Sequence, residues 1–451
     1  MKKSIALSTA ALLSCTLLQA AEVKVDGKDA GDVELMFKAM HIVSEKENGF
    51  APSNGSGYLI KLKYDTPDIL TDGLKIGVGM YANGDTGATE WDEFNTPTGD
   101  YNKPAKGMFV SEEGKTKALL GEAYLSYKND ILHAKAGRQI LNTPLTKIKW
   151  SLMPNFYEAY VVGADPVEDL SITAAYLTKM SFGSRAMTDW GLIGERTGTA
   201  GAAVKLTQDG GTVDQANFYN MGTAAGTDEI DGVAALGLSY KGIKNLDVNL
   251  WAYNAQNIAN EYYADANYAI PVAKGMKVKL SAQYLAQRDT GDALARQINF
   301  SMYGAKAALG TKKWGAFVAY NQSCDDDQFV NAWGADPAYT SSIFSRNAYR
   351  ADVSAYKVGA HYKIMKGMKL MVSHADYGQS KTVMGGTGLA AVTDAVETDI
   401  VLVYKPTKAW MFKIFNAIRT SEYDGTTHPS AAHKWTGRKM NHVRAVASYT
   451  F

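Results

Sequence analysis

The chain repeats one pattern along most of its length: an alternating run of about ten residues, a short polar turn, and a second alternating run. In one example, Leu246, Val248 and Leu250 alternate with polar or aromatic residues after a turn at 241–244. Successive side chains of a β-strand point to opposite faces, so each run predicts a strand with one apolar face. One such hairpin is equally typical of a soluble antiparallel sheet. About twenty candidate runs in one chain instead predict a large all-β architecture.

The connections between these runs fall into two length classes that alternate along the chain. One class has two to nine residues, and the other consists of long polar segments at 83–117, 179–198, 322–349 and 422–436. Membrane barrels have short periplasmic turns at one end and long extracellular loops at the other. A soluble sandwich or propeller has no reason to segregate its loops in this way. We therefore expect a transmembrane antiparallel β-barrel of about 18 strands (16–20) around a water-filled lumen.

The N-terminal residues predict export. Lys2 and Lys3 precede an apolar stretch from Ile5 to Leu18, and small residues follow around Ala20. This order is typical of a secretory signal peptide, which we place at 1–20, so that 21–451 forms a single barrel domain. A lipoprotein signal ending before Cys15 is the alternative, and the apolar residues after Cys15 disfavour it. The segment 21–451 then carries one cysteine, Cys324, so no internal disulfide is expected.

The C-terminal residues predict a strand that closes the barrel. One face of the run 443–451 is apolar, and Arg444 lies on the other face, which we expect to face the lumen. The apolar face, expected to meet lipid, consists of Val443, Ala445, Ala447, Tyr449 and Phe451. A closed barrel needs its last strand to pair with its first, because an open sheet edge does not occur in hydrocarbon. The ending Tyr449-x-Phe451 also resembles the signal by which outer-membrane proteins reach their assembly machinery.

Two local motifs carry a family resemblance. Gly137-Arg138-Gln139-Ile140-Leu141-Asn142-Thr143-Pro144-Leu145 is followed by Met153-Pro154-Asn155-Phe156-Tyr157-Glu158-Ala159. Together they resemble OprD-type outer-membrane porins, and the major porins of epsilonproteobacteria are similar in length and strand style. The resemblance implies an 18-stranded barrel for passive uptake of small solutes, often carboxylates or amino acids. It also implies that the segment 141–155 is a constriction loop.

The constriction differs from the family pattern at one point. The family places an acidic residue and an arginine just before Met-Pro, whereas this chain has Lys149-Trp150-Ser151-Leu152. We expect Lys147, Lys149 and Arg138 to supply the positive charge at the constriction, because fixed cations in a narrow pore attract carboxylates. The alternative is that Lys147 and Lys149 are solvated on an exterior loop.

Alternation also predicts which charged residues face the lumen, because their opposite-phase neighbours are apolar. A solvated pore wall needs polar residues in any case, so this position does not by itself imply selectivity. The predicted lumen residues are Glu122, His133, Lys135, Lys277, Lys279, Lys357, His361, Lys363 and Arg444.

No arrangement of residues indicates catalysis, a cofactor or zinc. Asp325, Asp326 and Asp327 are a weak calcium candidate, because they lack the alternating spacing of a calcium loop. The expected partners are outer-membrane lipids, lipopolysaccharide, the barrel-assembly machinery and small solutes. The near-zero net charge indicates no nucleic acid partner. A homotrimer and a monomer both remain open, as do two rival functions, a surface-loop adhesin or receptor and a barrel enzyme.

Overall fold

The computed structural model of the chain describes most of the sequence beyond the predicted signal peptide, which lies outside the described residues. The described residues are 21–25, 28–46, 53–86, 117–148, 151–183, 217–330, 333, 335–345, 351–379, 392–423 and 438–451.

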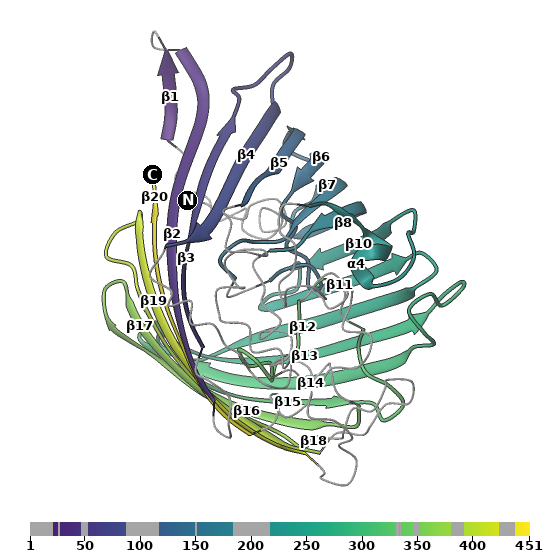
Figure 1. Cartoon of the computed structure of the whole chain (residues 1–451), viewed down its shortest axis with the longest axis vertical. Coiled ribbons are helices and arrows are strands. Elements are labelled where there is room, and N and C mark those ends of the chain that lie inside the picture. Colours follow the sequence, from purple (N-terminus) through teal and green to yellow (C-terminus); the bar gives the residue numbers. More distant parts are fainter. Residues whose placement is uncertain are drawn as a thin grey trace, which may run out of the picture.

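The described strands form one antiparallel sheet that closes on itself (Figure 1). The sheet has 20 strands, but β1 pairs only with β2 and the two-residue β9 pairs only with β8, so 18 strands form the barrel wall. This confirms the predicted fold class. The strands are β1 Ala21–Val25, β2 Lys28–Lys46, β3 Ser53–Asp65, β4 Leu74–Asp85, β5 Lys117–Lys128, β6 Leu132–Gln139, β7 Phe156–Val167, β8 Leu170–Ser181, β9 Tyr219–Asn220, β10 Val233–Tyr240, β11 Leu246–Ala255, β12 Ala259–Ala273, β13 Met276–Asp289, β14 Asn299–Gly310, β15 Trp314–Ser323, β16 Ser354–Met365, β17 Met368–Tyr377, β18 Val392–Tyr404, β19 Trp410–Tyr423 and β20 Arg438–Thr450.

The barrel closes where β20 pairs with β2, so the yellow end of the chain lies beside its purple beginning in Figure 1. The ladder runs from Lys46 opposite Met440 to Met36 opposite Thr450. Phe451 extends it by exchanging two backbone hydrogen bonds with Leu35, at 2.8 and 3.1 Å. Every backbone group that faces hydrocarbon needs such a partner, so this pairing removes the sheet edge.

The outer face of the wall is apolar and exposed, as alternation predicted. On β7, Tyr160 and Val162 are 61% and 54% exposed, whereas the alternate residues Ala159 and Val161 are buried. Aromatic rings gather on the outer face beside the closing strand. The Trp410 ring lies 4.9 Å from Tyr449 and 5.4 Å from Phe412 between centroids. The predicted lipid-facing phase of β20 is therefore the outward one.

Short turns join the strands at one end of the barrel. Asp169 and Asn245 adopt positive φ angles of 70° and 66° in the turns after β7 and β10. Asp and Asn tolerate this left-handed conformation better than other non-glycine residues. None of the helices in the described part of the chain is long and apolar enough to cross a membrane.

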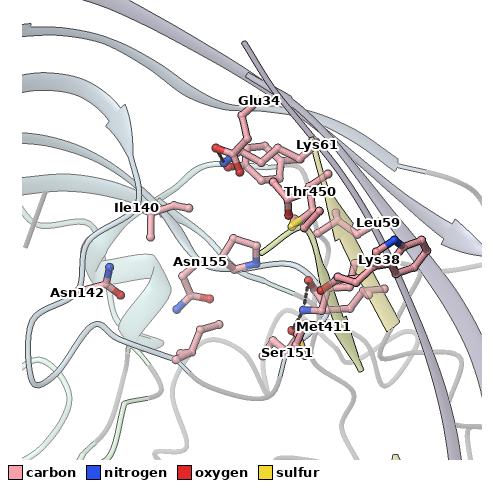
Figure 2. A pocket seen from close by; sticks show the side chains of 18 of the residues that line it. Glu34, Lys38, Leu59, Lys61, Ile140, Asn142, Ser151, Asn155, Met411 and Thr450 are labelled. Atoms are coloured by element: carbon pink, nitrogen blue, oxygen red, sulfur yellow. Dashed lines mark hydrogen bonds and ion pairs between the residues drawn. The ribbon is translucent and has the colours of Figure 1, made fainter. Parts of the chain in front are cut away.

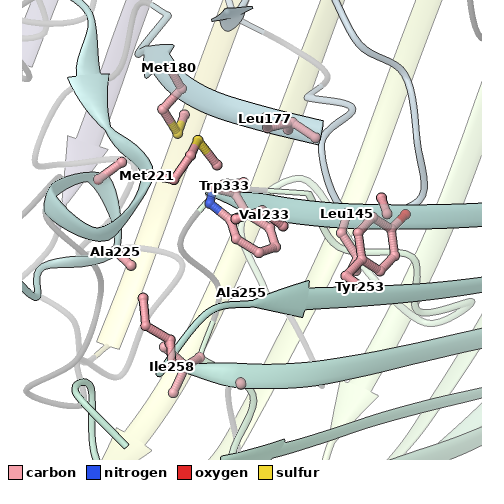
Figure 3. Close-up of a cluster of buried hydrophobic side chains, with 14 of the residues drawn as sticks. Leu145, Leu177, Met180, Met221, Ala225, Val233, Tyr253, Ala255, Ile258 and Trp333 are labelled. Atoms are coloured by element: carbon pink, nitrogen blue, oxygen red, sulfur yellow. The ribbon is translucent and has the colours of Figure 1, made fainter. Parts of the chain in front are cut away.

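The largest apolar core lies on the lumen side of the wall, against β7 to β14. It includes residues from the loop after β6, from the loop after β15 and from the short helix α4, Met221–Ala225. In Figure 3, Leu145 of the first loop lies beside Tyr253, and Trp333 of the second lies beside Val233. The inward-folded loops thus fill this side of the barrel with close-packed side chains.

Candidate functional site

The segment 140–155 leaves the wall after β6 and reaches a strand on another part of the barrel. The Lys38 Nζ of β2 donates to the carbonyl oxygens of Ser151 and Leu152, at 2.6 and 3.0 Å. Figure 2 shows Lys38 and Ser151 meeting beside Met411 of β19. We call its described residues, 140–148 and 151–155, the inward loop; they include the described part of the segment 141–155 that the sequence predicted as a constriction.

The inward loop is braced by its own hydrogen bonds. The Thr143 backbone N–H donates to the Thr146 Oγ1 at 2.9 Å, and the Tyr157 hydroxyl donates to the Thr146 carbonyl at 3.3 Å. Leu141 and Leu145 are buried in the apolar core. Buried contacts and hydrogen bonds therefore hold the inward loop in place.

A cavity of about 390 Å³ lies between the inward loop and the wall. Four lysines line it against the single carboxylate of Glu34: Lys38 and Lys61 come from β2 and β3, and Lys405 and Lys408 from the turn between β18 and β19. Its loop side carries the polar side chains of Asn142 and Asn155. Sequence reasoning missed all five charged residues, although the alternation of Glu34, Met36 and Lys38 along β2 predicts that the three share a face.

Beside this cavity, a network of paired charges covers the lumen face of β2 to β5. The Lys61 Nζ lies 2.8 Å from Glu34 Oε2, and the Lys63 Nζ lies 3.0 Å from Asp65 Oδ2. Glu122 accepts from the Tyr81 hydroxyl at 2.5 Å and lies within 4.0 Å of both lysines. The predicted lumen residue Glu122 is therefore in the expected phase but is neutralised by its neighbours.

Lys135 and His133 of β6 also lie in the lumen phase, and both are buried. The Lys135 Nζ lies over the Tyr124 ring, 3.6 Å from its centroid. A cation over a ring face is attracted by the ring quadrupole. The His133 ring covers Gly163, where any added Cβ would lie 1.8 Å from the ring.

The loop after β15 also folds inward, and we call its described part, 324–330, 333 and 335–345, the second loop. Gln287 of β13 holds its backbone by donating to the Val330 carbonyl at 3.0 Å and accepting from the Val330 N–H at 2.8 Å. The Asn155 Nδ2 donates to the Trp333 carbonyl at 3.0 Å, which joins the two loops. Burial raises the pKa of the Tyr339 hydroxyl, which donates to the Ala282 carbonyl at 3.0 Å.

The second loop covers two of the predicted lumen residues. Lys357 of β16 is 7% exposed, and its Nζ donates to the Ser341 carbonyl at 2.8 Å. Arg444 of β20 is 1% exposed, and its guanidinium lies over the rings of Phe344 and Phe415, at 5.5 and 5.4 Å. Both residues are in the predicted phase, but they contact the loop and the wall instead of facing water.

Four predicted residues remain accessible in the lumen phase. Lys277 and Lys279 of β13 are exposed, as is Lys363 of β16, and His361 is partly exposed. All four lie near the short-turn ends of their strands. These residues can therefore act on a passing ion through solvent.

Arg138 lies outside the lumen phase of β6, and its role at the constriction stays a prediction. Within β6 it shares a face with Ala134 and Ala136, opposite to the face of His133 and Lys135. Its Nε donates to Glu158 Oε1 at 2.9 Å, and Glu158 lies in the outward phase of β7 with Tyr160. The sequence motif placed Arg138 beside the loop correctly, but the strand phase turns its side chain outward.

The two lysines proposed for the constriction cannot both be placed. Lys147 is exposed on the inward loop, between Thr146 and Ile148, which line the cavity, while Lys147 itself is not among the lining residues. Lys149 lies outside the described residues. The role of Lys147 in selectivity stays a prediction.

The aspartates of the calcium candidate have other partners. Asp327 accepts from the Arg296 guanidinium, and Asp326 accepts from the Asn299 Nδ2 at 2.9 Å. Among the described residues, no group of three or more His, Cys, Asp or Glu side chains is arranged to hold a metal ion. These carboxylates instead connect the second loop to the β13–β14 connection and to β14.

Comparisons with known proteins agree with this geometry. A family model described as outer membrane porin, OprD family, matches residues 98–450. The structure is similar to OpdK of Pseudomonas aeruginosa, with 12% identity, a TM-score of 0.69, and coverage of 93% of this chain and 98% of that one. It is also similar to OccAB4 of Acinetobacter baumannii, with 13% identity, a TM-score of 0.67, and coverage of 97% and 100%. A second OpdK structure, with vanillate, has 13% identity, a TM-score of 0.69 and the same coverage as the first. No curated protein matches the sequence.

Proposed function

The chain belongs to the OprD family of outer membrane porins, and we propose that it passes small hydrophilic solutes by diffusion with a preference for carboxylates. The family and the fold indicate an outer-membrane channel rather than an enzyme. The observation that carries the proposed preference is the cavity under the inward loop, with its four lysines against one glutamate. Lys61 is neutralised by Glu34 at 2.8 Å, and the Lys38 Nζ is held by two loop carbonyls, so the excess positive charge of the cavity comes from Lys405 and Lys408.

The preference follows from electrostatics in a narrow aqueous path. A cleft lined by one sign of charge, with low-dielectric walls, concentrates ions of the opposite sign. The accessible lysines Lys277, Lys279 and Lys363 extend the positive potential along the lumen. The fold neighbour OpdK has a structure with vanillate, an aromatic carboxylate, and its solute has the chemistry that this lumen favours.

Planar-bilayer recording with purified protein tests both parts of the proposal. We expect an ohmic channel whose reversal potential in a salt gradient shows anion preference. The double variant Lys405→Ala/Lys408→Ala removes two cavity charges without removing a wall–loop contact, so its anion preference should fall while its conductance stays of the same order. A protein that forms no channel overturns the porin function, and a cation preference in the wild type overturns the carboxylate part alone.

A further inference from the structure

Two carboxylates on β18 face the backbone of the second loop where its N–H groups need acceptors. Glu397 accepts from the Phe344 N–H through Oε1 at 2.9 Å and from the Ser345 N–H through Oε2 at 2.6 Å. Asp399, two residues along the same face, accepts from the Ile343 N–H through Oδ2 at 3.2 Å. Three consecutive backbone N–H groups thus donate hydrogen bonds to two wall carboxylates.

Donors on the neighbouring strands hold the carbonyl side of the same segment. The Tyr377 hydroxyl of β17 lies 2.5 Å from the Thr340 carbonyl and 3.0 Å from the Ser345 carbonyl. The Lys357 Nζ of β16 donates to the Ser341 carbonyl and lies 3.6 Å from Asp399 Oδ2. The Arg419 Nε of β19 donates to the Ser345 Oγ at 2.9 Å. The segment 340–345 is therefore held by four adjacent strands.

We propose that Glu397 and Asp399 are positioning residues that latch the segment 340–345 against the barrel wall and thereby set the width of the open channel. The inference rests on the proposed function, because only a conducting barrel has an open width to set. The wall residues Glu397, Asp399, Lys357 and Tyr377 are all buried, so the segment covers them completely. Glu397 accepts from two successive N–H groups through its two oxygens, so it is the main attachment point of the segment, and Asp399 adds the third contact.

The latch also bears on the inward loop. Trp333, earlier in the second loop, accepts from Asn155 of the inward loop, and Trp333 is buried in the apolar core. Trp333 and the segment 340–345 belong to the same loop. Releasing 340–345 from the wall therefore weakens the support that Trp333 gives to the inward loop. The positions of both loops depend on the wall carboxylates.

The variant Glu397→Gln/Asp399→Asn tests the latch, because both oxygens of Glu397 accept and an amide there turns one of them into a donor facing an N–H group. We expect the open-channel current to become noisier, with added conductance levels, while the barrel still assembles. Asp376→Asn is the matched control: this carboxylate lies on β17 in the outward phase and is exposed, so its removal should leave the current unchanged.

A chemical readout separates the latch from the channel function. Ser341 Oγ is buried and has no hydrogen-bond partner among the described residues, so Ser341→Cys in a Cys324→Ser background is a mild probe. A membrane-impermeant thiol reagent should modify this cysteine at least tenfold faster when Glu397→Gln/Asp399→Asn is added. Equal rates with and without the latch substitutions overturn the latch, whatever the current does. A wild-type protein that forms no channel overturns the proposed function, while the thiol rates still decide whether the carboxylates hold the loop.

Discussion

Lys38 of β2 donates to the Ser151 carbonyl at 2.6 Å although the two residues are 113 positions apart in the sequence. The bond joins the first strand of the barrel wall to the inward loop. A second bond from the same Nζ, to the Leu152 carbonyl at 3.0 Å, fixes two successive carbonyl groups. A wall lysine that the alternation places in the lumen thus holds the inward loop.

Lys38→Met should loosen the inward loop. A hydrogen bond contributes about 0.5–1.5 kcal/mol net, and the substitution removes two, so the population of the detached loop should rise roughly five- to hundredfold. We expect larger open-channel noise and passage of larger neutral polymers in bilayer recordings. Lys405→Met removes the same charge from the same cavity without a loop contact; if it reproduces the added noise, charge rather than attachment is responsible.

Lys277, Lys279 and Lys363 should carry more of the anion preference than Lys357. The first three are exposed to the lumen, whereas Lys357 is covered by the second loop. The triple alanine variant should shift the reversal potential toward cations, most clearly at low salt, where screening extends to about 30 Å at 0.01 M. Lys357→Met should change the noise more than the reversal potential. A reversal potential unchanged in the triple variant would refute the assignment.

Part of this site follows from the sequence and part does not. Alternation alone places Lys277, Lys357 and Arg444 on the lumen face, because the side-chain period of a strand is fixed. It does not show that Lys357 and Arg444 are covered, since their contacts with Ser341 and Phe344 depend on how the second loop folds and not on the alternation within a strand. For Arg138, the motif predicts a position next to the inward loop, whereas the phase of β6 places the side chain on the face opposite to His133 and Lys135.

The alternating runs and the turns between them predict about 18 strands. The predicted range of 16–20 strands reflects segments that are too short to assign. β9 has only two residues, Tyr219–Asn220, and β1 has five, and neither belongs to the wall because each pairs with a single strand. Such runs are too short to distinguish a wall strand from a loop, because pairing partners rather than local pattern decide the outcome. Lys38 lies under the inward loop because β2 and the loop meet in the folded barrel. The alternating pattern of one strand does not predict such a contact between distant segments.

Glu34→Gln should destabilise the barrel because it leaves Lys61 with a weaker partner. The two side chains are 5% and 6% exposed and lie 2.8 Å apart. Breaking a buried ion pair by removing one partner costs about 3–5 kcal/mol, an upper limit here because Glu122 also lies 4.0 Å from Lys61. Unfolding in guanidinium from lipid vesicles measures the change. The double variant Glu34→Gln/Lys61→Met should recover most of the loss; no recovery would mean that the pair does not account for it.

Phe451→Ala should impair assembly more than conduction. The backbone of Phe451 closes the ladder with Leu35, while its side chain is 58% exposed on the outer face, away from the lumen. Burying a phenyl group in an apolar phase is worth about 1.5–3 kcal/mol, and this general loss must be separated from recognition by the assembly machinery. Phe412→Ala is the matched control, because Phe412 is 40% exposed on the outer face of the neighbouring strand β19. We expect Phe451→Ala to lower the yield of heat-modifiable, folded barrel several-fold further than Phe412→Ala, and each assembled variant to conduct as the wild type does. Equal yields for the two variants would show that the terminal phenylalanine contributes hydrophobic area only.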